Sequence, residues 1–401
     1  MKLDVDRLRA ETPGCERVIH FNNAGAALVP ATVLQTMTDY LVLEAEIGGY
    51  EAADARRDDV DDFYAAIADL LGCEAHNVAF APSATDAFAR ALSSIPFEPG
   101  DVLLTTRDDY ISNQIAFLSL RKRLGVDVVH APNLPGGGVD TEAIGRLMRE
   151  RRPRLVAVTH IPTNSGLVQP VAEIGRRCRE LDLLYLVDAC QSAGQYVIDV
   201  GQIGCDFLSA TCRKFLRGPR GSGFLYVSDR ALAAGYEPLF IDMRGARWVE
   251  FEGYAPVETA ARFEDWEFSY AAVLGAAAAA RYALAVGIDA IAARTPALGA
   301  RLRDELAEVD GVRVLDQGSE RCAIVTLTLD GWTSEALKHE LQVRRINSSV
   351  SLREHALYDL TDKGVDACLR LSPHYYNTEQ EVDDVVGALR ELGEQSSREA
   401  P

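Results

Sequence analysis

The chain has 401 residues, of which 48% are apolar and 25% are charged, and its formal net charge at pH 7 is −19. A chain of this length can bury a full core and is expected to form two or three structural units. The negative balance argues against a nucleic-acid partner, because phosphate groups would repel the protein.

Eight cysteines are scattered along the chain without a C-x-x-C pair. Neither a zinc site nor a thioredoxin-type redox site is therefore predicted, and we expect no metal. Several cysteines lie in apolar stretches, where a reduced thiol behaves as a small hydrophobic group. The first residues lack the apolar region of a signal peptide, and no apolar run reaches membrane-spanning length. We expect a cytoplasmic protein without a membrane partner.

Short apolar stretches between residues 77 and 228 predict a sheet. Their aliphatic and β-branched residues are typical of strands buried on both faces. The seven stretches are 77–81, 102–106, 126–130, 155–159, 183–187, 207–210 and 223–227. Amphipathic helices are predicted between many of them, as at 85–92 and 171–181. This alternation predicts an α/β fold with a mainly parallel, seven-stranded sheet covered by helices.

The remaining third of the chain predicts a smaller α+β domain. An alanine-rich helix over 271–286 is expected to link it to the sheet. The pattern then predicts helices at 296–309, 334–343 and 379–392, and strands at 312–315, 323–329, 345–350 and 368–371. We predict a large domain at 21–275, with residues 1–20 and 276–401 forming the small domain and its linking helix. The polar tail 394–401 is expected to fray.

Lys214 is the most informative residue, because it lies between an apolar strand and a glycine-rich run. The other four lysines lie in charged or terminal stretches that predict exposure. Burial disfavours the charged form of an amine, which then becomes a nucleophile able to form a Schiff base with an aldehyde. Asp188, 26 residues earlier, ends a predicted strand, where it could hold the ring-nitrogen proton of pyridoxal 5′-phosphate. A solvated lysine near a turn is the alternative.

Taken together, the chain resembles the class V aminotransferase type of pyridoxal-phosphate enzymes, the fold-type I branch that includes cysteine desulfurases. The resemblance extends from Asn22-Asn23-Ala24-Gly25 to Arg370-Leu-Ser-Pro, with several motifs in the same order. It implies pyridoxal 5′-phosphate as cofactor, a small amino-acid substrate, and a homodimer with shared active sites.

The segment Ser83-Ala84-Thr85-Asp86 ends a predicted strand and opens a helix, which makes it a candidate anion site. The resemblance places the cofactor phosphate there, with Thr85 as a ligand. It also implies that Thr211 and Arg213 close the phosphate site. A plain helix N-cap is the alternative.

The resemblance assigns Tyr110 to the face of the pyridine ring, where desulfurases carry histidine. A tyrosine can stack, but it offers no imidazole for proton transfer. Gln191 would contact the ring hydroxyl. The loop 159–166 would also line the cofactor, and the choice between Thr163 and Asn164 stays open. A tyrosine in a surface loop is the alternative for Tyr110.

The planar fork of arginine matches a carboxylate, and the resemblance implies that Arg370 grips the substrate carboxylate. Asn23 and Ala24 are implied as further substrate contacts. The segment 262–269 resembles the loop that a partner subunit contributes, although Glu267 stands where desulfurases typically place threonine. Further candidates for the substrate entrance, or for a solvated loop, are Arg244, Arg247 and Trp248.

The reaction type depends on a missing cysteine. Desulfurases need a nucleophilic cysteine on a loop before the carboxylate-binding arginine, and residues 344–353 contain none. The segments 44–50, 213–221 and 371–374 resemble C–S lyases of ergothioneine assembly and of lincosamide pathways. We expect a C–S β-lyase that releases a thiol or sulfenate, pyruvate and ammonia from an S-substituted cysteine or its sulfoxide, with Lys214 and Tyr110 as catalytic residues. The alternatives are a class V aminotransferase, an epimerase, a decarboxylating oxidative deaminase, and a non-enzymatic cofactor-binding protein.

Overall fold

Seven strands form the central sheet of the computed structural model, which describes residues 3–399. Their spatial order is β2-β8-β7-β6-β5-β3-β4. Neighbours from β7 to β4 are parallel, whereas β8 is antiparallel to both β7 and β2. The strands are β2 (Val78–Ala81), β3 (Val102–Thr106), β4 (Asp127–Ala131), β5 (Leu155–Thr159), β6 (Leu184–Asp188), β7 (Phe207–Thr211) and β8 (Gly223–Val227). The predicted mainly parallel, seven-stranded sheet is confirmed.

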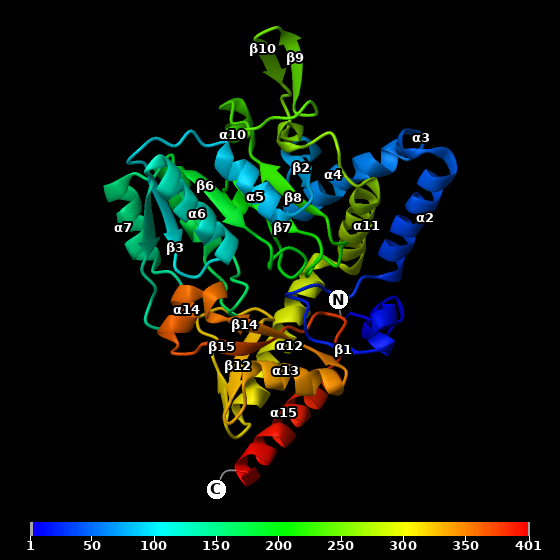
Figure 1. Ribbon diagram of the computed structural model, residues 1–401, viewed down its shortest axis with the longest axis vertical. Helices are drawn as coiled ribbons and strands as arrows, with labels where there is room; N and C mark the ends of the chain where they lie inside the picture. Colours follow the sequence, from blue (N-terminus) through cyan, green and yellow to red (C-terminus); the bar gives the residue numbers. More distant parts are fainter. Residues whose placement is uncertain (1–2, 400–401) are drawn as a thin grey trace.

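Helices cover both faces of this sheet (Figure 1). Alternate residues of a strand point to opposite faces. Accordingly, Leu155 and Leu186 lie in one hydrophobic core, whereas Val156 and Val187 lie in the other. The helices between the strands are α5 (Ala84–Ser93), α6 (Ile111–Leu124), α7 (Thr141–Arg151), α8 (Val171–Glu180) and α9 (Val200–Ile203). The 3₁₀ helix η2 (Ala75–Asn77) precedes β2, and α10 (Asp229–Ala233) follows β8.

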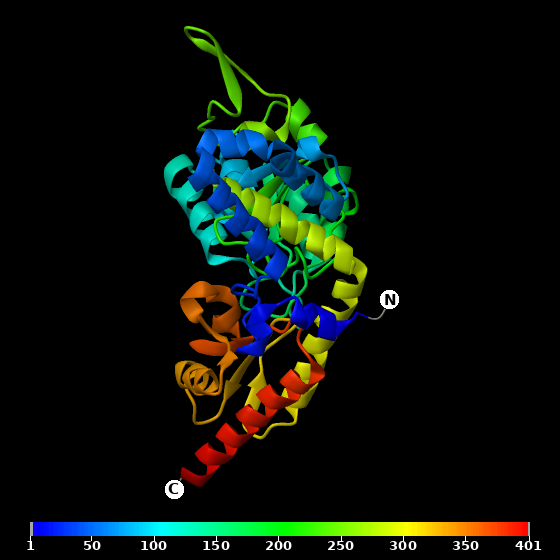
Figure 2. The ribbon, with the colours of Figure 1, turned by 90° about the vertical axis from the view of Figure 1, so that its right-hand side faces the viewer.

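The alanine-rich helix α11 (Tyr270–Val286) lies against two helices that precede the sheet (Figure 2). These are α2 (Ala31–Ile47) and α4 (Arg57–Leu71), with α3 (Gly49–Ala55) between them. Small side chains along α11 allow such close packing, and most of its alanines are buried. Within residues 3–399 no single helix has the length and hydropathy to cross a membrane, although α11 and α12 together meet these criteria as a pair bent by 85°.

A β-hairpin projects from the large domain at the top of Figure 1. It consists of β9 (Ala246–Glu250) and β10 (Gly253–Pro256), and the 3₁₀ helix η3 (Ala260–Phe263) follows it. The hairpin was not predicted, because its residues show no clear alternation of apolar and polar side chains.

The small domain contains a four-stranded antiparallel sheet in the order β11-β12-β15-β14. Its strands are β11 (Val312–Val314), β12 (Val325–Leu329), β14 (Ser349–Leu352) and β15 (Ala367–Leu371). Its helices are α12 (Ile288–Ala307), α13 (Ser334–Val343), η4 (Arg353–His355), α14 (Leu357–Asp362) and α15 (Glu379–Glu399). The N-terminal segment holds α1 (Val5–Ala10), η1 (Pro13–Glu16) and β1 (Ile19–His20), and β1 pairs with β13 (Ile346–Asn347).

Three predicted elements of the small domain differ from the structure. Helix α12 begins at Ile288 and contains Pro296, because buried residues on both sides of the proline outweigh one lost hydrogen bond. The strand predicted at 345–350 is divided into β13 and β14, which join different sheets. Helix α15 continues to Glu399 instead of ending at 392, since the glutamate, glutamine and arginine residues that follow favour a helix. The domain division at residues 20 and 275 stays a prediction.

Candidate active site

Lys214 lies just after β7, and only 6% of its surface is exposed. Burial lowers the pKa of Lys214 to about 8, and the nearby Arg213 and Arg370 act in the same direction. No carboxylate among residues 3–399 lies within ion-pairing distance of its Nζ. Lys363, which was expected to be exposed, is instead buried in an ion pair with Asp359, so Lys214 is the buried lysine without a counter-ion.

Asp188 ends β6, and its carboxylate is fixed by two neighbours. Its Oδ1 accepts a hydrogen bond from the backbone N of Cys190 at 2.9 Å, and its Oδ2 accepts one from Nδ2 of Asn113 at 3.0 Å. Only 3% of the residue is exposed. A carboxylate held in this way at the end of a strand can receive a positively charged ring nitrogen without rearrangement.

Tyr110 immediately precedes α6, and its ring centroid lies 5.9 Å from Nζ of Lys214. Asp109 fixes this turn, because its Oδ1 accepts hydrogen bonds from the backbone N of Tyr110 at 2.7 Å and from Nδ2 of Asn113 at 3.0 Å. Burial raises the pKa of Asp109 to about 6. Asn113 therefore bridges Asp109 and Asp188. Asn113 was not predicted as a site residue, although its helical spacing from Tyr110 was a usable indication.

Gln191, Thr163 and Arg370 form the other side of the site. Nε2 of Gln191 donates to Oγ1 of Thr163 at 3.2 Å, and Nη1 of Arg370 donates to the backbone oxygen of Thr163 at 3.1 Å. Asn164 instead donates to the backbone oxygen of His355 at 3.1 Å. The structure thus brings Thr163 to the group around Lys214 and directs Asn164 elsewhere.

Arg370 is buried on β15 of the small domain, and burial lowers the pKa of its guanidinium to about 10, so that it stays charged at neutral pH. Its Nη2 donates to Oδ1 of Asn22 at 3.3 Å. Asn22 is a site residue that the sequence reasoning missed, because its neighbour Asn23 was chosen. The side chain of Asn23 bonds within the protein, donating to the backbone oxygen of Ser372 and accepting from Tyr376.

The backbone of Ala24 is engaged in a similar way. Its N donates to Oγ of Ser372 at 3.0 Å, and its oxygen accepts from Gln191 at 3.1 Å. Ala24 thus lies beside Gln191. Asn23 holds this segment in place through its bonds to Ser372 and Tyr376. Their contacts with the substrate stay predictions.

The start of α5, at Ser83 and Ala84, packs closely against Gly223 of β8, and we call this contact the cradle. Oγ of Ser83 accepts from the backbone N of Asp86 at 3.1 Å, and Thr85 is exposed. A Cβ on Gly223 would lie 3.0 Å from the backbone N of Ala84, so this approach requires glycine. Thr211 pairs with Gly223, which brings the end of β7 to the same place. The helix start offers backbone N–H groups and a positive dipole end to an anion.

Arg213 is also half-buried next to Lys214, and its guanidinium donates to the backbone oxygen of Gly25. Burial lowers the pKa of Arg213. The predicted phosphate contact of Arg213 stays a prediction, and a guanidinium has further N–H groups to donate.

Two buried polar atoms of the site have no hydrogen-bond partner within the described part of the chain, namely Oε1 of Gln191 and Nε of Arg370. An unpartnered buried polar atom is costly unless a ligand completes its bonding. The amide oxygen is an acceptor that suits a ring hydroxyl, and the guanidinium N–H is a donor that suits a carboxylate. Together with the cradle at α5, these groups fit pyridoxal phosphate and an amino-acid substrate.

Arg244, a candidate for the substrate entrance or for a solvated loop, bonds within the large domain. Its guanidinium pairs with the buried carboxylate of Glu264 and donates to the hydroxyl of Tyr64 at 2.9 Å. The same carboxylate accepts from the backbone N of Phe80, so Arg244 neutralises a buried charge inside the large domain. Arg247 and Trp248 lie on the projecting hairpin.

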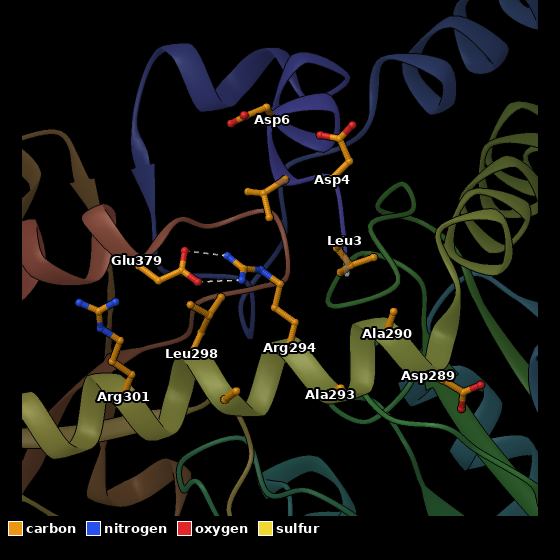
Figure 3. Close-up of a pocket in the computed structure, with 12 residues that line it drawn as sticks. Leu3, Asp4, Asp6, Asp289, Ala290, Ala293, Arg294, Leu298, Arg301 and Glu379 are labelled. Atoms are coloured by element: carbon orange, nitrogen blue, oxygen red, sulfur yellow. Dashed lines mark hydrogen bonds and ion pairs between the residues drawn. The ribbon is translucent and has the colours of Figure 1, made fainter. Parts of the chain in front are cut away.

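A hollow of about 880 Å³ lies away from Lys214, between the N-terminal segment and α12 (Figure 3). Its arginine Arg294 is directed toward Glu379 and pairs with it at 2.9 Å. Leu3 and Leu298 form part of its wall. Among the charged groups drawn, Arg294 and Glu379 bond to each other. None of the residues of the Lys214 group lines this hollow.

Residues 19–385 match the family described as aminotransferase class V. The chain belongs to this family. Membership confirms the resemblance found in the sequence, and with it pyridoxal 5′-phosphate as the cofactor of an enzyme.

Relatives of known sequence carry two kinds of name. The chain is 32% identical to a probable hercynylcysteine sulfoxide lyase of Mycobacterium tuberculosis (strain CDC 1551 / Oshkosh), an alignment that covers 96% of this chain and 92% of the relative. It is 30% identical to a probable cysteine desulfurase of Xylella fastidiosa (strain Temecula1 / ATCC 700964), with 96% and 95% covered.

Solved structures show the same fold. The apo cysteine desulfurase of Thermococcus onnurineus NA1 superimposes with a TM-score of 0.90 at 24% identity, covering 98% of this chain and 99% of the other. The cystine C–S lyase C-DES, in complex with its product cysteine persulfide, superimposes with a TM-score of 0.85 at 21% identity, covering 95% and 99%. The predicted fold class is thereby confirmed.

Proposed function

We propose that the enzyme is a C–S β-lyase that cleaves an S-substituted cysteine or its sulfoxide. The Cα–H and Cβ–S bonds break, the sulfur leaves as a thiol, or as a sulfenate from the sulfoxide, and one water hydrolyses the three-carbon fragment to pyruvate and ammonium. Atoms and electrons balance without an external oxidant or reductant.

The observation that carries this proposal is the lack of a usable thiol where a desulfurase needs one. Residues 344–353 contain no cysteine. Cys368 lies near Arg370 in sequence, but it is buried in a small cluster with Leu315 and Leu360. Burial raises the pKa of Cys368 to about 12, so it carries no thiolate near neutral pH. The sulfur of the substrate therefore has no protein nucleophile in this segment to attack it.

Cys190 is the other cysteine near the site, and it is also unsuited to accept sulfur. Burial, together with the neighbouring carboxylate of Asp188, raises the pKa of its thiol well above the ordinary value. Its backbone N is bonded to that same carboxylate. Cys190 therefore supports Asp188 and is unsuited to form a persulfide.

Each side chain of the site has a proposed task in this reaction. Bound pyridoxal phosphate withdraws electrons from the Cα of the substrate. Lys214, whose pKa of about 8 leaves a reactive neutral fraction near neutral pH, removes the Cα proton. Arg370 binds the substrate carboxylate with its planar fork, and Asp188 holds the proton of the ring nitrogen. Tyr110, whose ring lies 5.9 Å from Nζ of Lys214, would stack on the ring of the bound cofactor and hold it in place.

Further contacts to the cofactor are proposed for residues at both ends of the site. The phosphate would bind at Ser83, Ala84 and Thr85, supported by the helix start and the glycine cradle. Thr211 and Arg213 would complete that end. Gln191 and Thr163 would contact the ring hydroxyl, as the unpartnered Oε1 of Gln191 suggests.

The test is product analysis with purified protein and S-alkyl cysteines or their sulfoxides. We expect one pyruvate and one ammonium for each thiol or sulfenate released. Lys214→Ala should lower the rate by about a hundredfold or more, whereas Lys338→Ala, at an exposed lysine, should not. A keto acid formed only with an amino acceptor would establish transamination instead. Carbon dioxide release with oxygen uptake would establish oxidative decarboxylation. Exchange of the Cα proton with solvent, without any other product, would establish an epimerase.

We also propose that the enzyme is a cytoplasmic homodimer. All eight cysteines are unpaired, which is typical of a reducing compartment. The projecting hairpin exposes 79% of Trp248 and 97% of Phe251, and α2 exposes Leu41. Large apolar side chains exposed in this way are typical of an interface. Sedimentation should give the mass of a dimer for the unaltered protein. The double variant Trp248→Ser, Phe251→Ser should give the mass of a monomer. An unaltered protein that is fully active as a monomer would contradict the proposal.

A further inference from the structure

A second buried carboxylate, that of Asp109, lies close to the carboxylate of Asp188. Only 8% of Asp109 and 3% of Asp188 is exposed. A single amide nitrogen joins the two acids, because Nδ2 of Asn113 donates to Oδ1 of Asp109 at 3.0 Å and to Oδ2 of Asp188 at 3.0 Å. We call these three residues the carboxylate bridge. Its amide gives one hydrogen to each acid.

The orientation of the Asn113 amide is fixed by both acids together. An ionised carboxylate only accepts hydrogen bonds, and an amide has two hydrogens on nitrogen and none on oxygen. If the amide turned over, its oxygen would face two anions in a buried region. Asn113 can therefore hold the Asp188 carboxylate in one position only as long as Asp109 holds Asn113.

Neutral donors surround the Asp109 carboxylate and favour its charged form. Oδ1 also accepts from the backbone N of Tyr110 at 2.7 Å and from the hydroxyl of Thr159, and Oδ2 accepts from Nε2 of Gln114 at 2.7 Å. Hydrogen bonds to a carboxylate stabilise its charged form, whereas burial opposes it. Burial raises the pKa of Asp109 to about 6, so the group is mainly ionised at pH 7 and above.

Neither Asp109 nor Asp188 forms an ion pair with a lysine or arginine within residues 3–399. Two basic side chains of the surrounding segments pair with other acids: Arg107 with Asp362 at 2.6 Å and Lys363 with Asp359 at 2.6 Å. His130 of β4 reaches the network only through Gln114, at 2.8 Å. A positive charge placed against Asp188 would therefore interact with two carboxylates in succession.

We propose that Asp109 is a positioning residue for the ring nitrogen of pyridoxal phosphate. Through Asn113 it fixes the orientation of the Asp188 carboxylate, and its own negative charge helps to keep the proton on that nitrogen. The role of Asp109 rests on the proposed contact between Asp188 and the ring nitrogen. It deepens the proposed function, because a protonated ring withdraws electrons from the substrate more strongly.

The first measurement compares two ligands that differ at one ring atom. Pyridoxine 5′-phosphate has the ring nitrogen, whereas its deaza analogue has a C–H group there, and neither has the aldehyde that bonds to an amine. Both are titrated calorimetrically into the cofactor-free full-length protein. The ratio of the two Kd values, which we call the nitrogen preference, reports the interaction with the ring nitrogen. We expect a preference of about a hundredfold in the unaltered protein.

Asp109→Asn keeps an oxygen that can accept from Asn113 but removes the charge. It should lower the nitrogen preference by about tenfold and leave the Kd of the deaza analogue unchanged. Asp188→Asn should abolish the preference. The matched control is Asp108→Asn, since this carboxylate is also buried but bonds to Asn133 at 2.6 Å instead of to Asn113. The control should lower the preference by less than about twofold.

The second measurement uses the holoenzyme, loaded with pyridoxal phosphate that carries a heavy nitrogen isotope in the ring. The NMR shift of this nucleus distinguishes a protonated from an unprotonated nitrogen. We expect the shift of a protonated nitrogen in the unaltered enzyme and in Asp108→Asn. In Asp109→Asn the shift should move toward that of the unprotonated ring. A merely structural role of Asp109 would affect folding without moving this resonance.

Gln114→Met provides the same test if Asp109→Asn does not fold. It changes a half-buried side chain of α6 and removes the donor to Oδ2 of Asp109. Because a hydrogen bond to the charged form is lost, Asp109 is neutral for more of the time near pH 7. The nitrogen preference should then fall by about twofold or more at pH 7.

The outcomes separate the role of Asp109 from the proposals on which it rests. If Asp188→Asn abolishes the nitrogen preference while Asp109→Asn, or Gln114→Met in its place, retains it, the role of Asp109 is overturned and the contact of Asp188 stands. A full preference in Asp188→Asn would overturn both. An equal loss in Asp108→Asn and Asp109→Asn would overturn the carboxylate bridge in favour of a general effect of charge. No substrate is used, so the type of reaction does not affect the result.

Discussion

Removing the amine of Lys214 should stabilise the cofactor-free protein. In the folded chain burial lowers the pKa of Lys214 to about 8, whereas the ordinary value is 10.5. Below pH 8 the folded protein therefore carries a desolvated ammonium that the unfolded chain exposes to water. Each unit of pKa difference corresponds to about 1.4 kcal/mol, so the cost amounts to about 3 kcal/mol at pH 7. Methionine has a similar length, packs well in irregular sites and avoids this cost.

The pH dependence follows from the same difference. Between pH 8 and 10.5 the unfolded chain binds more protons at this lysine than the folded protein, so the free energy of unfolding rises with pH. Above 10.5 the amine is neutral in both states and the cost has disappeared. The advantage of Lys214→Met should therefore be full below pH 8 and shrink toward zero by about pH 10.5.

Urea unfolding of cofactor-free protein, followed at several pH values from about 7 to 10.5, measures this advantage. Each measurement compares the unaltered protein with Lys214→Met, and Lys338→Met at an exposed lysine serves as the control. The control should show no advantage that varies with pH. If Lys214→Met were less stable at pH 7, or its advantage were the same at every pH, the amine would not be desolvated in the folded protein.

Two further predictions concern packing and substrate binding. A Cβ on Gly175 would lie 1.8 Å from the backbone oxygen of Ile203, so Gly175→Ala should lower the free energy of unfolding by about 2 kcal/mol or more. The control is Gly387→Ala, which has open space around it and should be neutral or stabilising. Both variants are measured in the same urea experiment. Equal stability of the two variants would contradict the packing argument. Arg370→Lys keeps the charge but loses the fork, and we expect KM for the amino acid to rise by about tenfold, measured against an unchanged affinity for the cofactor by absorbance titration. A KM equal to that of the unaltered enzyme would remove Arg370 from the substrate site.

The central sheet could be predicted because most of its strands are short, mostly apolar runs. The stretches at β5 and β7 are buried at every residue, so their composition alone indicates a covered, mainly parallel sheet. Lys214 and Asp188 could be found for a related reason. Polar residues that follow buried strands are expected at the edge of the sheet where ligands bind.

Contacts between distant segments could not be predicted, since no local pattern encodes them. The bridge from Asp109 through Asn113 to Asp188 joins residues up to 79 positions apart, and nothing in the composition of either segment indicates it. The choice between Thr163 and Asn164 depends on the direction of two neighbouring side chains: Thr163 bonds to Gln191 and Asn164 to His355, and the cofactor contact of Thr163 stays a prediction. The ion pair between Arg244 and the buried Glu264 is another contact between two segments that the sequence does not indicate.

The two residues proposed to contact the substrate, Lys214 and Arg370, lie in the large and the small domain. Arg217, only three residues after Lys214, joins these two domains. Its guanidinium donates to the hydroxyls of Tyr375 at 2.7 Å and Thr12 at 2.5 Å, and it lies over the ring of Tyr376. If the two domains moved apart, the hydrogen bonds of Arg217 would break in a buried region where water does not replace them. The distance between the amine of Lys214 and the guanidinium of Arg370 is thus fixed before the substrate binds. We therefore expect the enzyme to reject β-amino acids, in which the amino and carboxylate groups are one carbon further apart, whatever their side chain.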